Sequence, residues 1–213
     1  MISLLLPLIY LSFISLGLPD ALLGAAWPTM YTELNVPLSY AGLISMIVSA
    51  GTVVSSLMSE RLTRRFGPGT VTAVSVGLTA LSLCGFALSG SFWQLCLIAV
   101  PYGLGAGSVD ACLNNYVAIH YASRHMSWLH CMWGVGASLG PGIMGRALAG
   151  GKGWHAGYGY IAVLQAVLTF ILLVSLPLWK KQAGENHASP SPVPLSQALF
   201  IRGVREVLLC FFC

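Results

Sequence analysis

The sequence has few charged residues. Asp, Glu, Lys and Arg make up 8% of its 213 residues, whereas soluble domains carry about 25%. Hydrophobic residues account for 56%, and the mean hydropathy is +0.80. These values exclude a water-soluble globular fold. Because the apolar runs are continuous, they predict an all-α membrane protein, since open sheets cannot span lipid.

The sequence also lacks the patterns of a nucleic-acid, disulfide or metal protein. Ten Lys and Arg against six Asp and Glu give a net charge of +4, but the basic residues form short clusters between apolar runs, so no nucleic-acid partner is predicted. Its six cysteines lie in apolar runs without C-x-x-C spacing, which is typical of buried packing residues. The histidine spacing resembles no metal site. We expect no metal and no cofactor.

Apolar runs bounded by Gly, Pro, Ser or charge predict six transmembrane helices. The loops between them are short, so consecutive helices should be antiparallel neighbours. The expected spans are Ser3 to Met30, Tyr40 to Ser59, Thr70 to Ser89, Phe92 to His120, Ser127 to Leu148 and His155 to Trp179.

The basic residues predict the orientation in the membrane. Only Arg146 and Lys152 fall on the side opposite the N-terminus. By the positive-inside rule, both termini are cytoplasmic and the protein is a multi-pass protein of the plasma (inner) membrane. The remaining basic residues, all on the N-terminal side, are Arg61, Arg64, Arg65, Arg124, Lys180, Lys181, Arg202 and Arg205.

Three domains are expected along the chain. Residues 1–179 form the six-helix bundle, residues 180–197 form a Pro-rich cytoplasmic linker, and residues 198–213 begin a seventh helix that is too short to cross a bilayer. This organisation predicts that the chain is the first half of something larger. Its expected partner is a second six-helix bundle, either a C-terminal half or a second copy.

A short repeat relates the two halves of the bundle. The pattern G-x-x-D-A-x-L occurs at Gly17–Leu23 and again at Gly107–Leu113. Because three helices separate the copies, they enter the membrane from opposite sides. This arrangement resembles the inverted 3+3 repeat found in each half of major facilitator transporters.

Two acids lie inside the predicted spans. Asp20 is in span one and Asp110 is in span four, at equivalent positions of the repeat. An ionisable residue in a bilayer costs about 2.5 to 3.5 kcal/mol on insertion scales, so it is a functional-site hypothesis by default. A carboxylate that faces a cavity can bind and release a proton. The alternative is a protonated Asp that hydrogen-bonds a neighbouring helix as packing glue.

Other polar and aromatic residues in the spans form a candidate solute site. His130 could relay protons, bind a polar solute or pack, and Gln165 could bond either a solute or another helix. Amides and aromatic faces suit a polyhydroxylated solute, although anchoring at the membrane interface is the favoured interpretation for any single aromatic. These residues are Asn114, Asn115, Trp27, Trp133 and Tyr102.

Two further motifs concern helix packing and orientation. Gly136, Gly140 and Pro141 give the fifth span a small-xxx-small spacing that permits a close helix contact. The loop after span two carries Glu60 with three arginines, Arg61, Arg64 and Arg65.

Over nearly its whole length the chain resembles the N-terminal half of a major facilitator superfamily transporter. The loop after span two is similar to the superfamily's G-x-x-x-D-R-x-G-x-R-R signature, with Glu60 in the Asp position, and the fifth-span glycines resemble a motif of proton antiporters. GLPDALLGAAWP, GAGSVDACLNNYVA and WLHCMWGVGASLGP look most like the fucose:proton symporter branch. That resemblance implies roles for Asp20 and Asp110 in solute binding and proton coupling.

The expected function is therefore proton-coupled symport of a sugar or similar small polar solute. Alternatives are a proton-linked exporter of hydrophobic compounds and a truncated, non-transporting membrane subunit. An enzyme is not expected, because no nucleophile and base pair accompanies the acids. Alone, the 213 residues are expected to insert in the membrane without catalysing transport.

Overall fold

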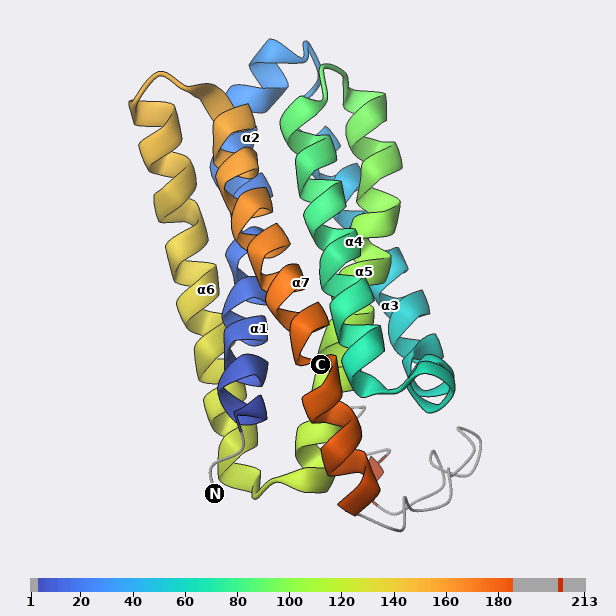
Figure 1. The fold of residues 1–213 in the computed structure, drawn as a ribbon. Helices are drawn as coiled ribbons and strands as arrows, with labels where there is room; N and C mark the ends of the chain where they lie inside the picture. Colours follow the sequence, from blue (N-terminus) through green and yellow to red (C-terminus); the bar gives the residue numbers. More distant parts are fainter. Residues whose placement is uncertain (1–3, 186–202, 205–213) are drawn as a thin grey trace. The chain divides into compact units, whose positions relative to one another are not determined.

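The computed structural model describes residues 4–185 and 203–204. Within these residues, α-helices are joined by short turns (Figure 1). The chain divides into one compact unit, Met1–Lys180, and another, Lys181–Cys213; the first holds the helical bundle. Most of the expected linker and seventh helix lies outside the described residues. The helices are α1 Leu5–Asp20, α2 Leu22–Glu33, α3 Tyr40–Phe66, α4 Pro68–Leu88, α5 Phe92–His120, α6 Ser123–Ala149 and α7 Gly153–Glu185 (Figure 1).

Five stretches of the described chain are long and apolar enough to cross a membrane. The first joins α1 and α2 over Leu5–Glu33, and α3, α4, α5 and the Gly153–Trp179 part of α7 supply the rest. The expected span in α6 is a full-length helix, but it falls short on hydropathy, since it carries two arginines, two histidines and many glycines. α7 also extends beyond the expected end of the sixth span at Trp179 and continues to Glu185.

The first span is interrupted where Asp20 lies. Proline has no N–H, so Pro19 cannot donate to the carbonyl of Ser15 one turn earlier. α1 ends at Asp20, Ala21 has φ −97° and ψ 2°, and α2 starts at Leu22. The sequence thus places a break in the backbone directly beside an acid.

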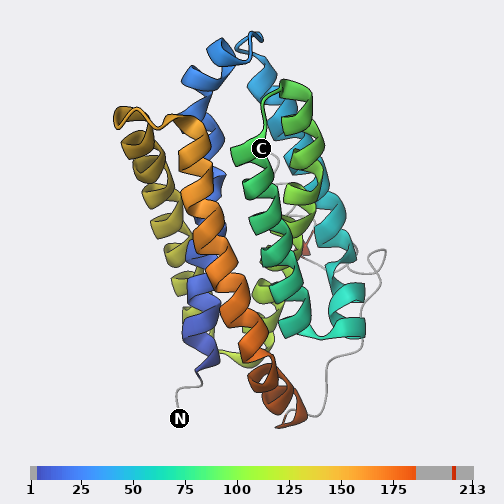
Figure 2. The ribbon, with the colours of Figure 1, turned by 45° about the horizontal axis from the view of Figure 1, so that its top comes forward.

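Glycines set the two closest helix pairs, α1 with α6 and α3 with α5. A Cβ on Gly136 or Gly140 of α6 would collide with backbone carbonyls of α1, and one on Gly103 or Gly107 of α5 would collide with backbone of α3. In both ribbon views α6 runs beside α1 and α4 runs beside α5 (Figures 1 and 2). Small residues let these backbones approach closely.

The apolar core forms two clusters. One, toward the α2 end of the bundle, includes Leu22, Met30 and Trp154. The other, toward the N-terminal end, includes Ile9, Leu113 and Leu172. On the first span they meet between Leu16 and Leu18. The polar side chains described next lie at this level.

Candidate functional site

Asp20 is tied to α6 at the break in the first span. Trp133 Nε1 donates a hydrogen bond of 2.7 Å to Asp20 Oδ2, and both side chains are exposed. One turn before Asp20, Gly17 packs against the backbone carbonyl of Trp133. A side chain at position 17 would separate the helices, so this glycine brings the indole within reach of the carboxylate.

Asp110 has a similar setting on α5. Asn114 Nδ2, one turn later, donates a hydrogen bond of 3.0 Å to Asp110 Oδ1. The buried Asn114 Oδ1 accepts no hydrogen bond from the described residues. Gly107, the repeat equivalent of Gly17, packs against the backbone of Thr52 in α3. Each acid therefore follows a glycine at which its helix touches a neighbour.

The two acids and a histidine influence one another electrostatically. The charge of Asp110 acts on Asp20, and the charge of His130 acts on Asp110. His130 is exposed, its ring lies 6.2 Å from that of Phe13, and its Nδ1 lies 2.9 Å from the carbonyl of Met126. Since a carbonyl only accepts, Nδ1 is the donor in this hydrogen bond.

Five of the residues singled out in the sequence thus gather from three helices. We call them the acidic face; its members are Asp20, Asp110, Asn114, His130 and Trp133. Every Arg and Lys of the first unit's described residues lies toward a helix end or in a loop. The acidic face can therefore hold protons and hydrogen-bond donors, but it offers an anion little beyond His130 and the indole N–H.

Three other candidates lie elsewhere. Trp27 is buried, and its Nε1 donates 2.8 Å to the carbonyl of Leu38 in the α2–α3 loop, so it fastens that loop to the core. Asn115 is exposed on α5 and projects about 100° around the helix from Asn114. Gln165 is buried and bonds α1. Of the two roles open to Gln165, the structure has the interhelical bond.

Gln165 compensates for Pro19. Its Nε2 donates a 2.7 Å bond to the Ser15 carbonyl, the group that the proline leaves without its helical partner. Its Oε1 accepts a 2.6 Å bond from Ser15 Oγ. A single amide on α7 therefore satisfies the backbone at the break that positions Asp20. The sequence signal was present in Pro19, but only the fold pairs it with Gln165.

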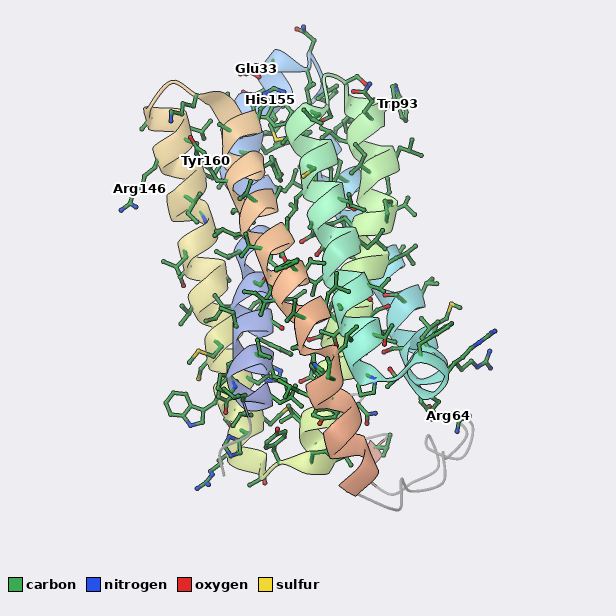
Figure 3. The ribbon with its side chains drawn as sticks, in the orientation of Figure 1. Glu33, Arg64, Trp93, Arg146, His155 and Tyr160 are labelled. Atoms are coloured by element: carbon green, nitrogen blue, oxygen red, sulfur yellow. The ribbon has the colours of Figure 1, made fainter. Side chains whose placement is uncertain are left out.

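The conformational motifs lie on two helices. The side chains of Glu60, Arg61, Arg64 and Arg65 are exposed near the end of α3, and Figure 3 shows Arg64 pointing away from the bundle. Gly136 and Gly140 form the α6 contact with α1, whereas a Cβ on Gly145 would meet nothing within 4 Å. Pro141 lies inside α6, directly after Gly140.

A pocket of about 320 Å³ opens beside the break, and sequence reasoning found only part of it. Asp20 and Gly24 belong to its rim, as do Ser45 and Ser49, which are one turn apart on α3 and exposed. The buried Tyr102 lines it, and its hydroxyl has no hydrogen-bond partner among the described residues. The spacing of the two serines in an apolar span was the available signal. The other lining residues are Pro19, Leu23, Ala41, Ile44, Val48, Leu83, Phe86 and Tyr158.

No metal cluster accompanies these groups in the described part of the chain. Within residues 4–185 and 203–204, no three His, Cys, Asp or Glu side chains gather closely enough to hold an ion.

Similar proteins of known sequence include a bacterial transport protein and a vesicle glycoprotein. The chain is 23% identical over 172 residues to the cis,cis-muconate transport protein of Acinetobacter baylyi, covering 79% of this chain and 41% of that protein. It is 24% identical over 165 residues to synaptic vesicle glycoprotein 2C of Rattus norvegicus, covering 76% of this chain and 23% of that protein. The chain thus spans less than half the length of these relatives.

Known structures and family models agree on the architecture. A crystal structure of the peptide transporter POT superposes on the chain with a TM-score of 0.71 at 20% identity, covering 97% of this chain and 45% of that one. This similarity shows the fold. The model of the Major Facilitator Superfamily matches residues 9–213. Given that match, the chain is a multi-pass membrane protein and belongs to the major facilitator superfamily.

Proposed function

We propose that the chain is the N-terminal bundle of a proton-coupled secondary transporter for a sugar or similar small polar solute. The observation that carries the proposal is the acidic face, where Asp20 and Asp110 each accept a hydrogen bond from a neighbouring side chain, Asp110 acts electrostatically on Asp20, and His130 acts on Asp110. Repulsion between two carboxylates favours protonation of one of them. Proton uptake at one acid then changes what the other can bind.

The hydrogen-bond partners of the two acids support a polar solute site beside them. Trp133 presents an indole beside Asp20, and Asn114 presents an amide beside Asp110. Indole and amide groups suit a neutral hydroxylated solute, since each hydroxyl both donates and accepts. The name of the muconate relative refers to a dicarboxylate, but two acids on one face would repel such an anion. We therefore propose a neutral solute.

The proposal includes a membrane setting and a second bundle. Both termini are cytoplasmic in the plasma membrane, because most basic residues lie on the N-terminal side. The acidic face meets a second six-helix bundle, and rocking of the two bundles alternates access to it. The 213 residues alone would carry no gradient-driven flux.

The test measures solute uptake by the complete protein that contains this chain, reconstituted in proteoliposomes. An inward proton gradient should drive accumulation of one or more members of a panel of radiolabelled monosaccharides. Asp110→Asn should abolish accumulation but retain exchange of labelled for unlabelled solute, because exchange needs no net proton movement. Glu33→Gln, an acid at the far end of α2, is the matched control and should transport normally. Accumulation by Asp110→Asn at the native level would refute the coupling role.

A second candidate is a proton-linked exporter of hydrophobic compounds. It is favoured by the Gly136, Gly140 and Pro141 pattern of α6, which resembles the antiporter motif and forms the α1 contact. The direction of flux separates the two functions: an exporter expels a lipophilic dye against its gradient and confers drug resistance, and takes up no sugar.

A further inference from the structure

The pocket beside the break has a chemistry distinct from that of the acidic face. Its walls are aliphatic and aromatic, and its buried members include Ile44, Leu83, Phe86 and Tyr158. Its rim is polar, with one carboxylate and two serine hydroxyls. Such a mainly apolar cavity with a few convergent polar groups is the usual form of a small-molecule site.

Tyr102 gives the pocket an unused polar group. Its side chain is 6% exposed, and its hydroxyl has no partner among the described residues. Leaving a buried hydroxyl unpaired costs free energy, so such groups are rare unless something binds them. Asp20 acts electrostatically on this hydroxyl, so the two groups lie on the same pocket.

Asp20 lines the pocket with one carboxylate oxygen already engaged. The Trp133 bond engages Oδ2, and no other side chain in the described part of the protein donates to Oδ1. None of the described residues that line the pocket is Lys, Arg or His, so none of them neutralises the carboxylate from this side. The pocket therefore suits a positively charged group that donates several hydrogen bonds.

We propose that this pocket binds the ammonium group of a small primary amine whose compact apolar body fills the rest of the cavity. An ammonium has three N–H donors, and the pocket presents Asp20 Oδ1, the Tyr102 hydroxyl and the Ser45 and Ser49 hydroxyls as acceptors. The faces of Phe86 and Tyr158 add cation–π and apolar contact. A sugar fits poorly, because the aliphatic wall leaves most of its hydroxyls unpaired.

This amine site is separate from the solute site of the proposed function, although both use Asp20. Trp133 belongs only to the acidic face, and Tyr102 lines only the pocket. Tyr102→Phe therefore changes the pocket without removing a hydrogen bond of the acidic face, whereas Trp133→Phe removes the indole bond to Asp20 and leaves the Tyr102 hydroxyl in place. Binding also needs no proton gradient, so a failure of proton coupling would leave the amine site standing.

The test measures equilibrium binding of phenethylamine to the purified full chain in nanodiscs by calorimetry, with phenethyl alcohol and phenylacetate as uncharged and anionic counterparts. The amine should bind at least about tenfold more tightly than the alcohol, and phenylacetate should not bind. Asp20→Asn should remove the preference for amine over alcohol. Tyr102→Phe should weaken amine binding by roughly three- to tenfold. Glu33→Gln should bind like the native chain.

Thermal unfolding of each variant separates binding from folding. Tyr102→Phe removes only an unpaired hydroxyl, so it should be at least as stable as the native chain. Weaker amine binding with unchanged stability then assigns the hydroxyl to the ligand. Native affinity in Tyr102→Phe would overturn the proposal, as would an amine affinity that falls in Trp133→Phe but not in Tyr102→Phe, which places the amine on the acidic face.

Discussion

Replacing Gln165 by Leu removes the polar link between α7 and the break in the first span. Leu has nearly the volume of Gln, so the change deletes hydrogen bonds without opening a large cavity. Two bonds disappear, one to the Ser15 carbonyl at 2.7 Å and one from Ser15 Oγ at 2.6 Å. The carbonyl then has no donor, because Pro19 supplies none.

The expected cost follows from these two bonds and from their burial. Interhelical hydrogen bonds in membrane proteins are worth about 0.6 kcal/mol on average and up to about 1.7 kcal/mol. Gln165 is 1% exposed, so solvent cannot replace the lost partners. Together the two bonds predict that Gln165→Leu lowers the free energy of unfolding by about 1 to 3 kcal/mol. Ser15→Ala, which deletes only one bond, should cost about half as much.

Pro19→Ala provides a sharper test of the reasoning. Alanine at position 19 restores an N–H that can reach the Ser15 carbonyl, so Gln165 is no longer the only donor for it. Gln165→Leu should therefore cost about 1 kcal/mol less in the Pro19→Ala background than in the native chain.

The measurement is a denaturant titration of all four chains in mixed micelles, followed by circular dichroism. It yields the coupling free energy between positions 19 and 165. An equal cost of Gln165→Leu in both backgrounds would show that the glutamine does not act through the carbonyl freed by the proline. A cost below about 0.3 kcal/mol in the native chain would show that the pair of bonds contributes nothing measurable to stability.

Two further predictions concern helix contacts. Gly140→Ala places a Cβ against the Leu18 carbonyl and should destabilise the chain by about 1 to 3 kcal/mol. Gly145→Ala is the control, because its Cβ meets nothing within 4 Å, and it should leave the free energy of unfolding unchanged in the same titration. Equal effects of the two variants would contradict the close α1–α6 contact. Trp154 Nε1 donates a 2.6 Å hydrogen bond to Glu33 Oε2 at the end of α2, where Figure 3 labels Glu33. Glu33→Ala should therefore speed hydrogen exchange in the last turn of α2, while Glu33→Gln keeps an acceptor and should not. Equal exchange in both variants would show that this hydrogen bond does not hold the end of α2.

Much of the architecture follows from the sequence because the bilayer imposes it. A chain with this little charge must satisfy its backbone within helices, and the length of each apolar run fixes a span. The expected Phe92–His120 helix is observed with those bounds, and the glycines of the fifth span lie at a close contact. The hydropathy of α6 was overestimated, because His130, Arg146 and several glycines were counted within one apolar run, Ser127 to Leu148.

The sequence also singled out most of the acidic face, since an acid, an amide or a histidine in an apolar run stands out by its cost. Asp20, Asp110, Asn114 and His130 were all recognisable for that reason. The sequence could not show which of these residues contact one another. Asp20 and Trp133 are 113 residues apart, and only the packing of Gly17 against α6 brings them within 2.7 Å.

The tertiary structure alone shows the partners of the remaining polar residues. Gln165 and Trp27 carry groups that can bond a solute or a carbonyl, and only the fold brings them to the carbonyls of Ser15 and Leu38. The pocket beside Asp20 arises where six helices leave space between their side chains, which no single helix encodes. Local hydropathy therefore determines which segments cross the membrane, whereas long-range packing determines which polar groups remain free to bind.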